Sequence, residues 1–179
     1  MSKTPLRTAM HHRSITHQSW LHKDGTLEIE SRLLDTKAYD TTVGFDRELS
    51  AGEPLHDMTI NIRLGSDTLI RDIELRMDAT PFDICPEVIR RFESLRGASM
   101  GRGWNAMLSR RFSGISGCRH LVELLRGMGT VAFQSMPHEG WSRESVTTFS
   151  DSCYAFCQGG PIMARLTAEF AANIDRDNH

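Results

Sequence analysis

Apolar and polar residues alternate along the first half of the chain with the two-residue period of a half-buried strand. The alternation is clearest over 58–64 and 69–77, on either side of a Gly-Ser-Asp turn. One-sided alternation of this kind is typical of an antiparallel sheet with one face in water. We therefore predict a hairpin of these two segments. In its second strand, the residues expected to face the core are Leu69, Ile73, Leu75 and Met77.

A second strand pair is predicted around Lys23-Asp24-Gly25, which is a strong turn signal. Apolar residues alternate after the turn, at Leu27, Ile29 and Leu33. The segment 13–22 before the turn is the candidate partner strand, although its alternation is poor. The stretch 40–54 has no periodicity and contains two glycines, so it is expected to be a long surface loop.

After Pro81 the apolar period becomes helical. Helices are predicted over Pro86–Arg96, 104–112 and Cys118–Gly127, with a terminal helix over 164–172. A loop over 136–143 and a turn of helix over 151–156 are expected between them. Strands followed by helices favour the α+β class. We predict a single domain over 1–179, with an antiparallel sheet from about 13–78 packed against helices from about 86–173, and a polar tail over 174–179.

The composition excludes several classes of function but does not identify one. The 179 residues are 39 % hydrophobic and 25 % charged, which is enough to bury a core, and the net charge of −2 provides no basic field for nucleic acid or membrane. No run approaches the roughly 18 apolar residues of a membrane span, and four cysteines are too few for a disulfide scaffold. We expect a cytoplasmic protein that meets a small-molecule substrate or ligand, with a homodimer left open.

Two cysteines stand at predicted helix starts, where the positive end of the helix dipole favours the thiolate form. Cys85 precedes Pro86, and Cys118 is followed two residues later by His120. These residues, with one carboxylate, suit zinc or iron rather than magnesium or calcium. The alternative is that both cysteines are inert packing residues. The carboxylates considered for the fourth ligand position are Asp78, Asp83 and Asp57.

His56 and Asp57 enter a predicted strand from the long loop and suggest a general acid/base pair or further metal ligands. Adjacent strand residues point to opposite faces, so only one of them can reach a site beneath the helices. The alternative is a polar junction satisfied locally. We expect His120 and Cys118, joined by either His56 or Asp57, to border one concave pocket, with the loop 40–54 as a lid.

The other histidines and cysteines suggest less. His11 and His12 are expected to be too exposed to form a site, whereas His17 and His22 suit a pocket edge. Cys153 and Cys157 stand four residues apart, and packing is the favoured interpretation.

Several motifs occur together in an order that resembles one bacterial family. They are Asp24-Gly25, Leu34-Asp35-Thr36-Lys37, Gly52-Glu53-Pro54-Leu55-His56-Asp57-Met58, Cys85-Pro86 and Gly117-Cys118-Arg119-His120-Leu121. The chain resembles the family catalogued as domain of unknown function 2889 from about residue 13 to 160. The resemblance implies no activity, but it implies that Asp35-Thr36-Lys37, His56-Asp57 and Cys118-x-His120 belong to a shared pattern. The order of sheet and helices is also similar to that of iron–sulfur scaffold proteins, by arrangement alone.

Three kinds of function remain open. The first is a small-molecule enzyme of hydrolase or lyase type, with His120, His56 or Asp57 as acid/base groups and a metal- or thiol-assisted site near a helix N-terminus. The second is a non-enzymatic metal or iron–sulfur accessory protein that uses the same ligands. The third is a metal-free ligand-binding subunit. Metal analysis discriminates most cheaply, because stoichiometric zinc or iron supports the first or second kind, whereas no metal leaves thiol or base catalysis and ligand binding.

Overall fold

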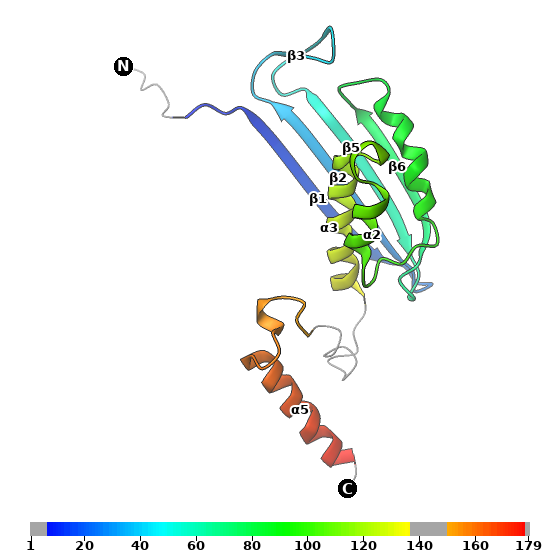
Figure 1. The fold of residues 1–179 in the computed structure, drawn as a ribbon, viewed down its shortest axis with the longest axis vertical. Helices are drawn as coiled ribbons and strands as arrows, with labels where there is room; N and C mark the ends of the chain where they lie inside the picture. Colours follow the sequence, from blue (N-terminus) through cyan, green and yellow to red (C-terminus); the bar gives the residue numbers. More distant parts are fainter. Residues whose placement is uncertain (1–6, 137–149, 178–179) are drawn as a thin grey trace. The chain divides into compact units, whose positions relative to one another are not determined.

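The computed structural model describes residues 7–136 and 150–177 (Figure 1). The chain forms two compact units, 1–136 and 137–179. The predicted single domain spanning both stays a prediction. Within the described residues, no helix combines the length and the apolar character needed to cross a membrane.

A four-stranded antiparallel sheet forms the first unit's base, in the order β1-β2-β5-β6. Its strands are β1 (His11–Leu21), β2 (Leu27–Lys37), β5 (Pro54–Leu64) and β6 (Ile70–Ala79). The β5–β6 pair is the hairpin that the alternation predicts. The weakly alternating segment before Gly25 does pair with β2, along its whole length. The α+β class is therefore confirmed.

The segment 40–54, expected to be a long surface loop, contains a small hairpin of its own. Its strands are β3 (Thr41–Val43) and β4 (Arg47–Leu49). Three-residue strands are too short to produce a recognisable period, which is why the segment was expected only to be a long surface loop. Phe45 at the tip is 94 % exposed and contacts the Phe82 ring edge-on, with the ring centroids 6.2 Å apart.

Helices of the first unit lie over one face of the sheet (Figure 1). In place of the single helix predicted at 86–96, the chain forms a 3₁₀ turn, a four-residue α-helix and a second 3₁₀ turn. The third predicted helix continues to Ser135, beyond Gly127. The elements are η1 (Cys85–Val88), α1 (Ile89–Phe92), η2 (Glu93–Leu95), α2 (Trp104–Arg111), η3 (Gly114–Ser116) and α3 (Arg119–Ser135).

The second unit contains η4 (Tyr154–Phe156) and α5 (Pro161–Asp177), which starts earlier and ends later than the predicted terminal helix. Met163 and Leu166 form its small apolar cluster, against which Phe156 packs. Cys153 and Cys157 are exposed free thiols rather than packing residues. Most of the loop predicted over 136–143 lies outside the described residues.

The core lies between the sheet and the helices of the first unit. Met58, Ile60, Ile62 and Leu64 from β5 are buried there, together with Leu121, Leu124, Leu125 and Met128 from α3. On β6, Ile73 is buried and Leu75 and Met77 pack against the core as predicted, but Ile70 is buried in place of Leu69. The pairing shifts between Arg63 and Leu64, and this bulge inverts the alternation at the start of β6.

Two glycines inside α3 allow close contacts with neighbouring side chains. A Cβ atom at Gly127 would overlap the imidazole of His17 on β1, and one at Gly129 would lie 2.6 Å from Cδ1 of Trp104. Trp104 is buried, and its indole N–H donates to the Leu125 carbonyl at 2.8 Å. Glycine costs a helix about 1 kcal/mol relative to alanine. Here the absent side chains provide the space for His17 and Trp104.

Candidate functional site

A buried carboxylate interrupts the apolar inner face of the sheet. Every second residue of β2 faces the helices, from Leu27 through Leu33, and the next residue in this phase is Asp35. Its side chain is 1 % exposed. A buried charge is costly unless it is paired and hydrogen-bonded, so the surroundings of Asp35 decide whether it can remain ionised.

Asp35 is neutralised from the neighbouring strand β1. Arg13 lies opposite it in the β1–β2 register and donates from Nε to Oδ1 and from Nη2 to Oδ2, both at 2.7 Å. Such a two-point guanidinium–carboxylate pair is among the stronger polar contacts in proteins. His11 Nε2 lies 3.2 Å from Oδ1. Burial acts to raise the pKa of Asp35, but the hydrogen bonds and charge of Arg13, together with those of His56, outweigh burial and lower the pKa to about 2, so Asp35 is ionised at neutral pH.

His56 completes the carboxylate's hydrogen bonds from the other side. It lies opposite Asp35 in the β2–β5 register, and its Nδ1 is 3.0 Å from Oδ2. An ionised carboxylate can only accept, so Nδ1 carries the proton and Nε2 keeps its lone pair. The β2–β5 register shifts at the adjacent Asp35/Thr36 position, and bulges of this kind are common beside active sites. Arg13, Asp35 and His56 thus form one row across three strands.

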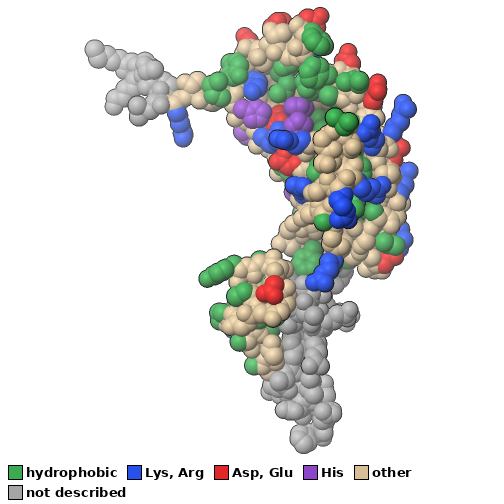
Figure 2. Space-filling model, viewed as in Figure 1, with side chains coloured by type: hydrophobic (Ala, Val, Ile, Leu, Met, Phe, Trp, Pro, Cys, Tyr) green, Lys and Arg blue, Asp and Glu red, His purple; other side chains and the backbone are tan. Residues whose placement is uncertain are grey.

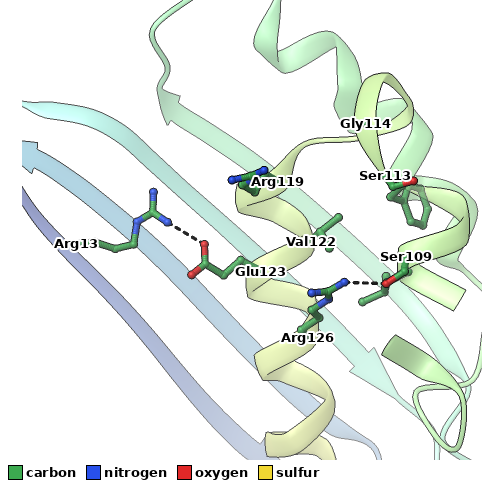
Figure 3. Close-up of a pocket in the computed structure, with 10 residues that line it drawn as sticks. Arg13, Ser109, Ser113, Gly114, Arg119, Val122, Glu123 and Arg126 are labelled. Carbon is green, nitrogen blue, oxygen red and sulfur yellow. Dashed lines mark hydrogen bonds and ion pairs between the residues drawn. The ribbon is translucent and has the colours of Figure 1, made fainter. Parts of the chain in front are cut away.

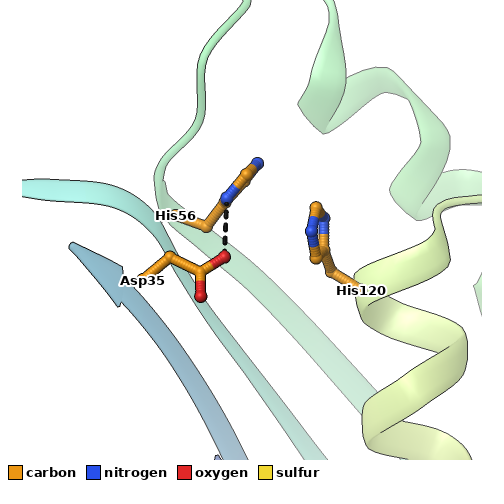
Figure 4. A group of neighbouring side chains, drawn as sticks. All are labelled: Asp35, His56 and His120. Carbon is orange, nitrogen blue, oxygen red and sulfur yellow. Dashed lines mark hydrogen bonds and ion pairs between the residues drawn. The ribbon is translucent and has the colours of Figure 1, made fainter. Parts of the chain in front are cut away.

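His120 approaches this row from the first turn of α3. Its ring centroid lies 4.0 Å from that of His56, with the ring planes inclined at 43° (Figure 4). One ligand-type atom each of Asp35, His56 and His120 lies within 4.8 Å of the others. Histidine side chains gather on the face seen in Figure 2, with acidic and basic side chains around them. We call Asp35, His56 and His120 the Asp/His/His cluster.

Burial and nearby positive charge keep both imidazoles of the cluster neutral. Burial is the largest cause of the lowered pKa of His120, which falls to about 4, and the charges of His56 and Arg13 lower it further. Burial likewise lowers the pKa of His56, although the Asp35 carboxylate acts in the opposite direction. At neutral pH the cluster therefore consists of one carboxylate and two neutral rings that offer proton-accepting nitrogens.

The lowered pKa of His120 predicts a loss of stability in acid. The unfolded chain binds a proton at His120 near its ordinary pKa of 6.5, whereas the folded chain does so only near 4. The free energy of unfolding should fall as the pH falls from about 6.5 to 4, by about 2 kcal/mol for a half-buried ring. Asp35 adds little to this fall between pH 6.5 and 4, because its own stabilisation is lost only below its ordinary pKa of 3.8, as the pH approaches 2.

Urea unfolding between pH 7 and pH 4 measures this effect in the wild-type protein and in His120→Gln. The variant has no titrating ring at position 120, so its free energy of unfolding should depend less on pH. Its loss of stability relative to the wild type should therefore shrink toward pH 4. Parallel curves across this range would contradict the prediction. His22→Gln is the matched control, because His22 pairs with Glu28 at 2.7 Å, apart from the cluster.

The residues predicted for the site separate into two groups. His120 and His56 come together, and Cys118 Sγ lies 3.9 Å from His120 Nδ1. Asp57 instead pairs with Arg32, which donates from Nε at 2.8 Å and from Nη2 at 2.6 Å. Asp57 follows His56 directly on β5 and therefore points to the opposite face, away from the helices, as expected from strand alternation.

The remaining predicted metal ligands lie elsewhere. Asp78 pairs with Arg76 at 2.8 Å, and Cys85 is a free, partly buried thiol at the start of η1. Among the described residues, the Asp/His/His cluster is the group whose donor atoms come within 4.8 Å of one another. The donor atoms of the predicted ligand set therefore do not all come within 4.8 Å of one another. This set consists of Cys118, His120, Cys85 and Asp78.

A groove lies beside the cluster, between α2 and α3 (Figure 3). Its cavity volume is about 920 Å³, and Arg13, Arg119, Glu123 and Arg126 contribute charged side chains to its lining. Arg13 joins the groove to the cluster, since its Nη1 donates to Glu123 at 2.8 Å while its other nitrogens hold Asp35. His120 is not one of the residues that line this groove.

Comparison with known proteins places the chain in a family. The family model described as "Protein of unknown function (DUF2889)" matches residues 11–134. The chain belongs to this family. No curated protein and no solved structure matches the chain. The matched range begins with β1 and includes nearly all of α3, so the whole Asp/His/His cluster and its partners on β1 belong to the part that the family shares.

Sequence reasoning from individual residues missed Asp35, Arg13 and His11. The signal for Asp35 was present in the pattern, because it continues the inner-face alternation of Leu27, Ile29 and Leu33 as a charged residue at a core position. The family resemblance did point to Asp35. Nothing in the irregular sequence of β1 placed Arg13 or His11 beside it. His11 is exposed, as expected, yet its Nε2 contacts Asp35.

Proposed function

We propose that the chain is a small-molecule enzyme in which His56, oriented by Asp35, and His120 transfer protons at one centre. The proposal rests mainly on the hydrogen bonds that Asp35 accepts. Its two oxygens accept two bonds from Arg13, one from His11 and one from His56. A carboxylate so fixed holds the His56 ring in one orientation and one tautomer, which is the role of the acid in a catalytic His–Asp pair.

Proton transfer would begin at Nε2 of His56. This nitrogen accepts a proton from the substrate or from an attacking water, and the ionised Asp35 stabilises the imidazolium that forms. His120 provides a second neutral ring beside it, suited to donate or accept a hydrogen bond at the atom that gains charge. Reactions of hydrolase or lyase type both need such a proton removal and a later proton return. The groove beside Arg13 supports a substrate of small-molecule size.

Variants of the cluster test the proposal once a panel of small esters and hydroxy acids yields a turnover. His56→Gln and His120→Gln should each lower kcat/KM by about 10²- to 10⁴-fold, the usual contribution of a general acid or base. Asp35→Asn should also lower it, because the amide can donate to Nδ1 and stabilise the wrong tautomer. His22→Gln should leave kcat/KM unchanged. Equal activity of the cluster variants and the control would reject the proposal.

A divalent metal is the second candidate for this centre, and the convergence of the three donor atoms favours it. Two imidazoles and one carboxylate are a donor set suited to zinc or non-haem iron(II), and Cys118 adds a thiol next to His120. Asp35, however, already uses its lone pairs for Arg13, His11 and His56. A metal held by His56 and His120 would therefore have Asp35 as the group that orients His56.

Metal analysis of protein purified without a histidine tag decides between the two candidates. Stoichiometric zinc or iron that disappears in both His56→Gln and His120→Gln would favour the metal enzyme or a metal accessory protein. Metal far below one equivalent, together with kcat/KM that chelators do not change, is the expected result for proton transfer by the histidines alone.

A further inference from the structure

Positive charge is concentrated in one short part of the chain. Residues 97–127 contain five arginines and a single acidic residue, Glu123, whereas the whole chain has a net charge of −2. This part includes α2, η3 and the first half of α3. Lys and Arg side chains spread over the helical region of the face seen in Figure 2. The helical layer is therefore electrostatically opposite to the rest of the protein.

Two of these arginines line the groove between α2 and α3 and make no ion pair with a described residue. Arg126 donates from Nη2 to Ser109 Oγ at 2.7 Å, which is a neutral partner. Arg119 makes no hydrogen bond or ion pair with any described residue. Glu123 stands between them on α3, but its carboxylate accepts from Arg13 at 2.8 Å. The groove thus presents two guanidinium groups that make no ion pair within the described part of the chain (Figure 3).

The rest of the lining suits an organic phosphate. Ser109 and Ser113 place hydroxyl groups in the groove, and Leu108, Phe112 and Val122 provide apolar surface. Arginine is the residue best adapted to oxyanions, since its planar fork makes two parallel hydrogen bonds. Two guanidinium groups without ion pairs suit the three terminal oxygens of a phosphate monoester better than the two oxygens of a single carboxylate. The volume of about 920 Å³ lies in the range of small-molecule pockets.

We propose that the groove between α2 and α3 binds the phosphate group of a small phosphorylated molecule through Arg119 and Arg126. The apolar side chains of the groove contact the organic part. This inference goes beyond the proposed function and does not depend on it, because neither arginine belongs to the Asp/His/His cluster. A nucleic acid also carries phosphates, but the chain as a whole has a net charge of −2 and only two of the five arginines in 97–127 line the groove, which favours a single small ligand.

Calorimetric titration at fixed ionic strength tests the proposal with phenyl phosphate, inorganic phosphate and benzoate. Phenyl phosphate should bind most tightly, because it alone has both the dianion and the apolar ring. Arg119→Gln and Arg126→Gln should each weaken its binding by about tenfold, the value of one charge-assisted hydrogen bond. Arg76→Gln is the matched control, since it removes the same charge from an exposed pair with Asp78, and it should have no effect.

Each other outcome of this experiment overturns the proposal. If Arg76→Gln weakens the binding of phenyl phosphate as much as the groove variants do, binding depends only on the overall charge of the protein. If benzoate binds as tightly as phenyl phosphate, the groove is a carboxylate site. A short RNA bound far more tightly than phenyl phosphate, with the same arginine dependence, would show a nucleic-acid surface. His56→Gln and His120→Gln should bind phenyl phosphate like the wild type. Failure of the proposed catalysis and failure of the phosphate site are therefore distinguishable.

Discussion

Arg13→Gln is expected to lower the free energy of unfolding by about 3 kcal/mol or more, which is the usual cost of breaking a buried ion pair from one side. The variant leaves the Asp35 carboxylate, 1 % exposed, without its two-point partner. His11 and His56 contact the same oxygens, but the lowered pKa of His56 keeps that ring neutral near pH 7. Urea unfolding at pH 7 measures the loss.

A double variant shows whether the uncompensated charge causes the loss. Adding Asp35→Asn removes the charge and should restore part of the stability lost in Arg13→Gln, although Asp35→Asn alone is destabilising. Arg76→Gln is the control, because its exposed ion pair is worth at most about 1 kcal/mol. If Arg13→Gln costs no more than Arg76→Gln, Asp35 is not a buried ionised group and the proposed orientation of His56 loses its basis.

Gly129→Ala is expected to destabilise the fold by about 2 kcal/mol, although alanine is the better helix former. The new methyl group would lie 2.6 Å from Cδ1 of Trp104. This indole cannot easily move, since it is buried among core residues and its N–H is bonded to the Leu125 carbonyl. Relief of the clash must therefore separate α2 from α3. The midpoint of urea unfolding should fall correspondingly.

Thr130→Ala provides the matched control on the same helix. Position 130 is exposed, so the alanine there brings its helix propensity without a clash and should stabilise slightly. The cost of Trp104→Ala should also be smaller in the Gly129→Ala background than in the wild type, because the two residues compete for one space. Strict additivity of these two changes would argue against the close contact.

The sheet and the helices of the first unit follow from short-range patterns, and for that reason most of the fold was predictable. Alternation identified β5 and β6, and apolar spacing identified α2 and the start of α3. The exceptions have local causes that a period cannot show, namely the bulge that buries Ile70 and the three-residue strands β3 and β4. The extension of α3 past Gly127 depends on side chains from β1 and α2 that fill the glycine positions.

The candidate site was only half predictable, because its contacts join distant parts of the chain. His56 and His120 drew attention as chemical groups beside a strand and a helix start. Their meeting depends on how α3 crosses the sheet, and the choice of His56 over Asp57 depends on strand phase. The position of Arg13 follows from the pairing of β1 with β2, which the poor alternation of β1 did not reveal.

The location of β1 at the edge of the sheet couples the chemistry of Asp35 to a local opening of the backbone. Among the strands of this sheet, β1 pairs only with β2, and it begins at His11. Fraying of its first three residues would withdraw both Arg13 and His11 from the carboxylate while leaving the β2–β5 and β5–β6 pairs intact. Asp35 binds a proton more readily in that frayed state, since the hydrogen bonds and charge of Arg13 help to lower its pKa to about 2. Acidification below about pH 4 therefore favours the frayed state. Proton uptake by Asp35 and release of the start of β1 are thermodynamically linked.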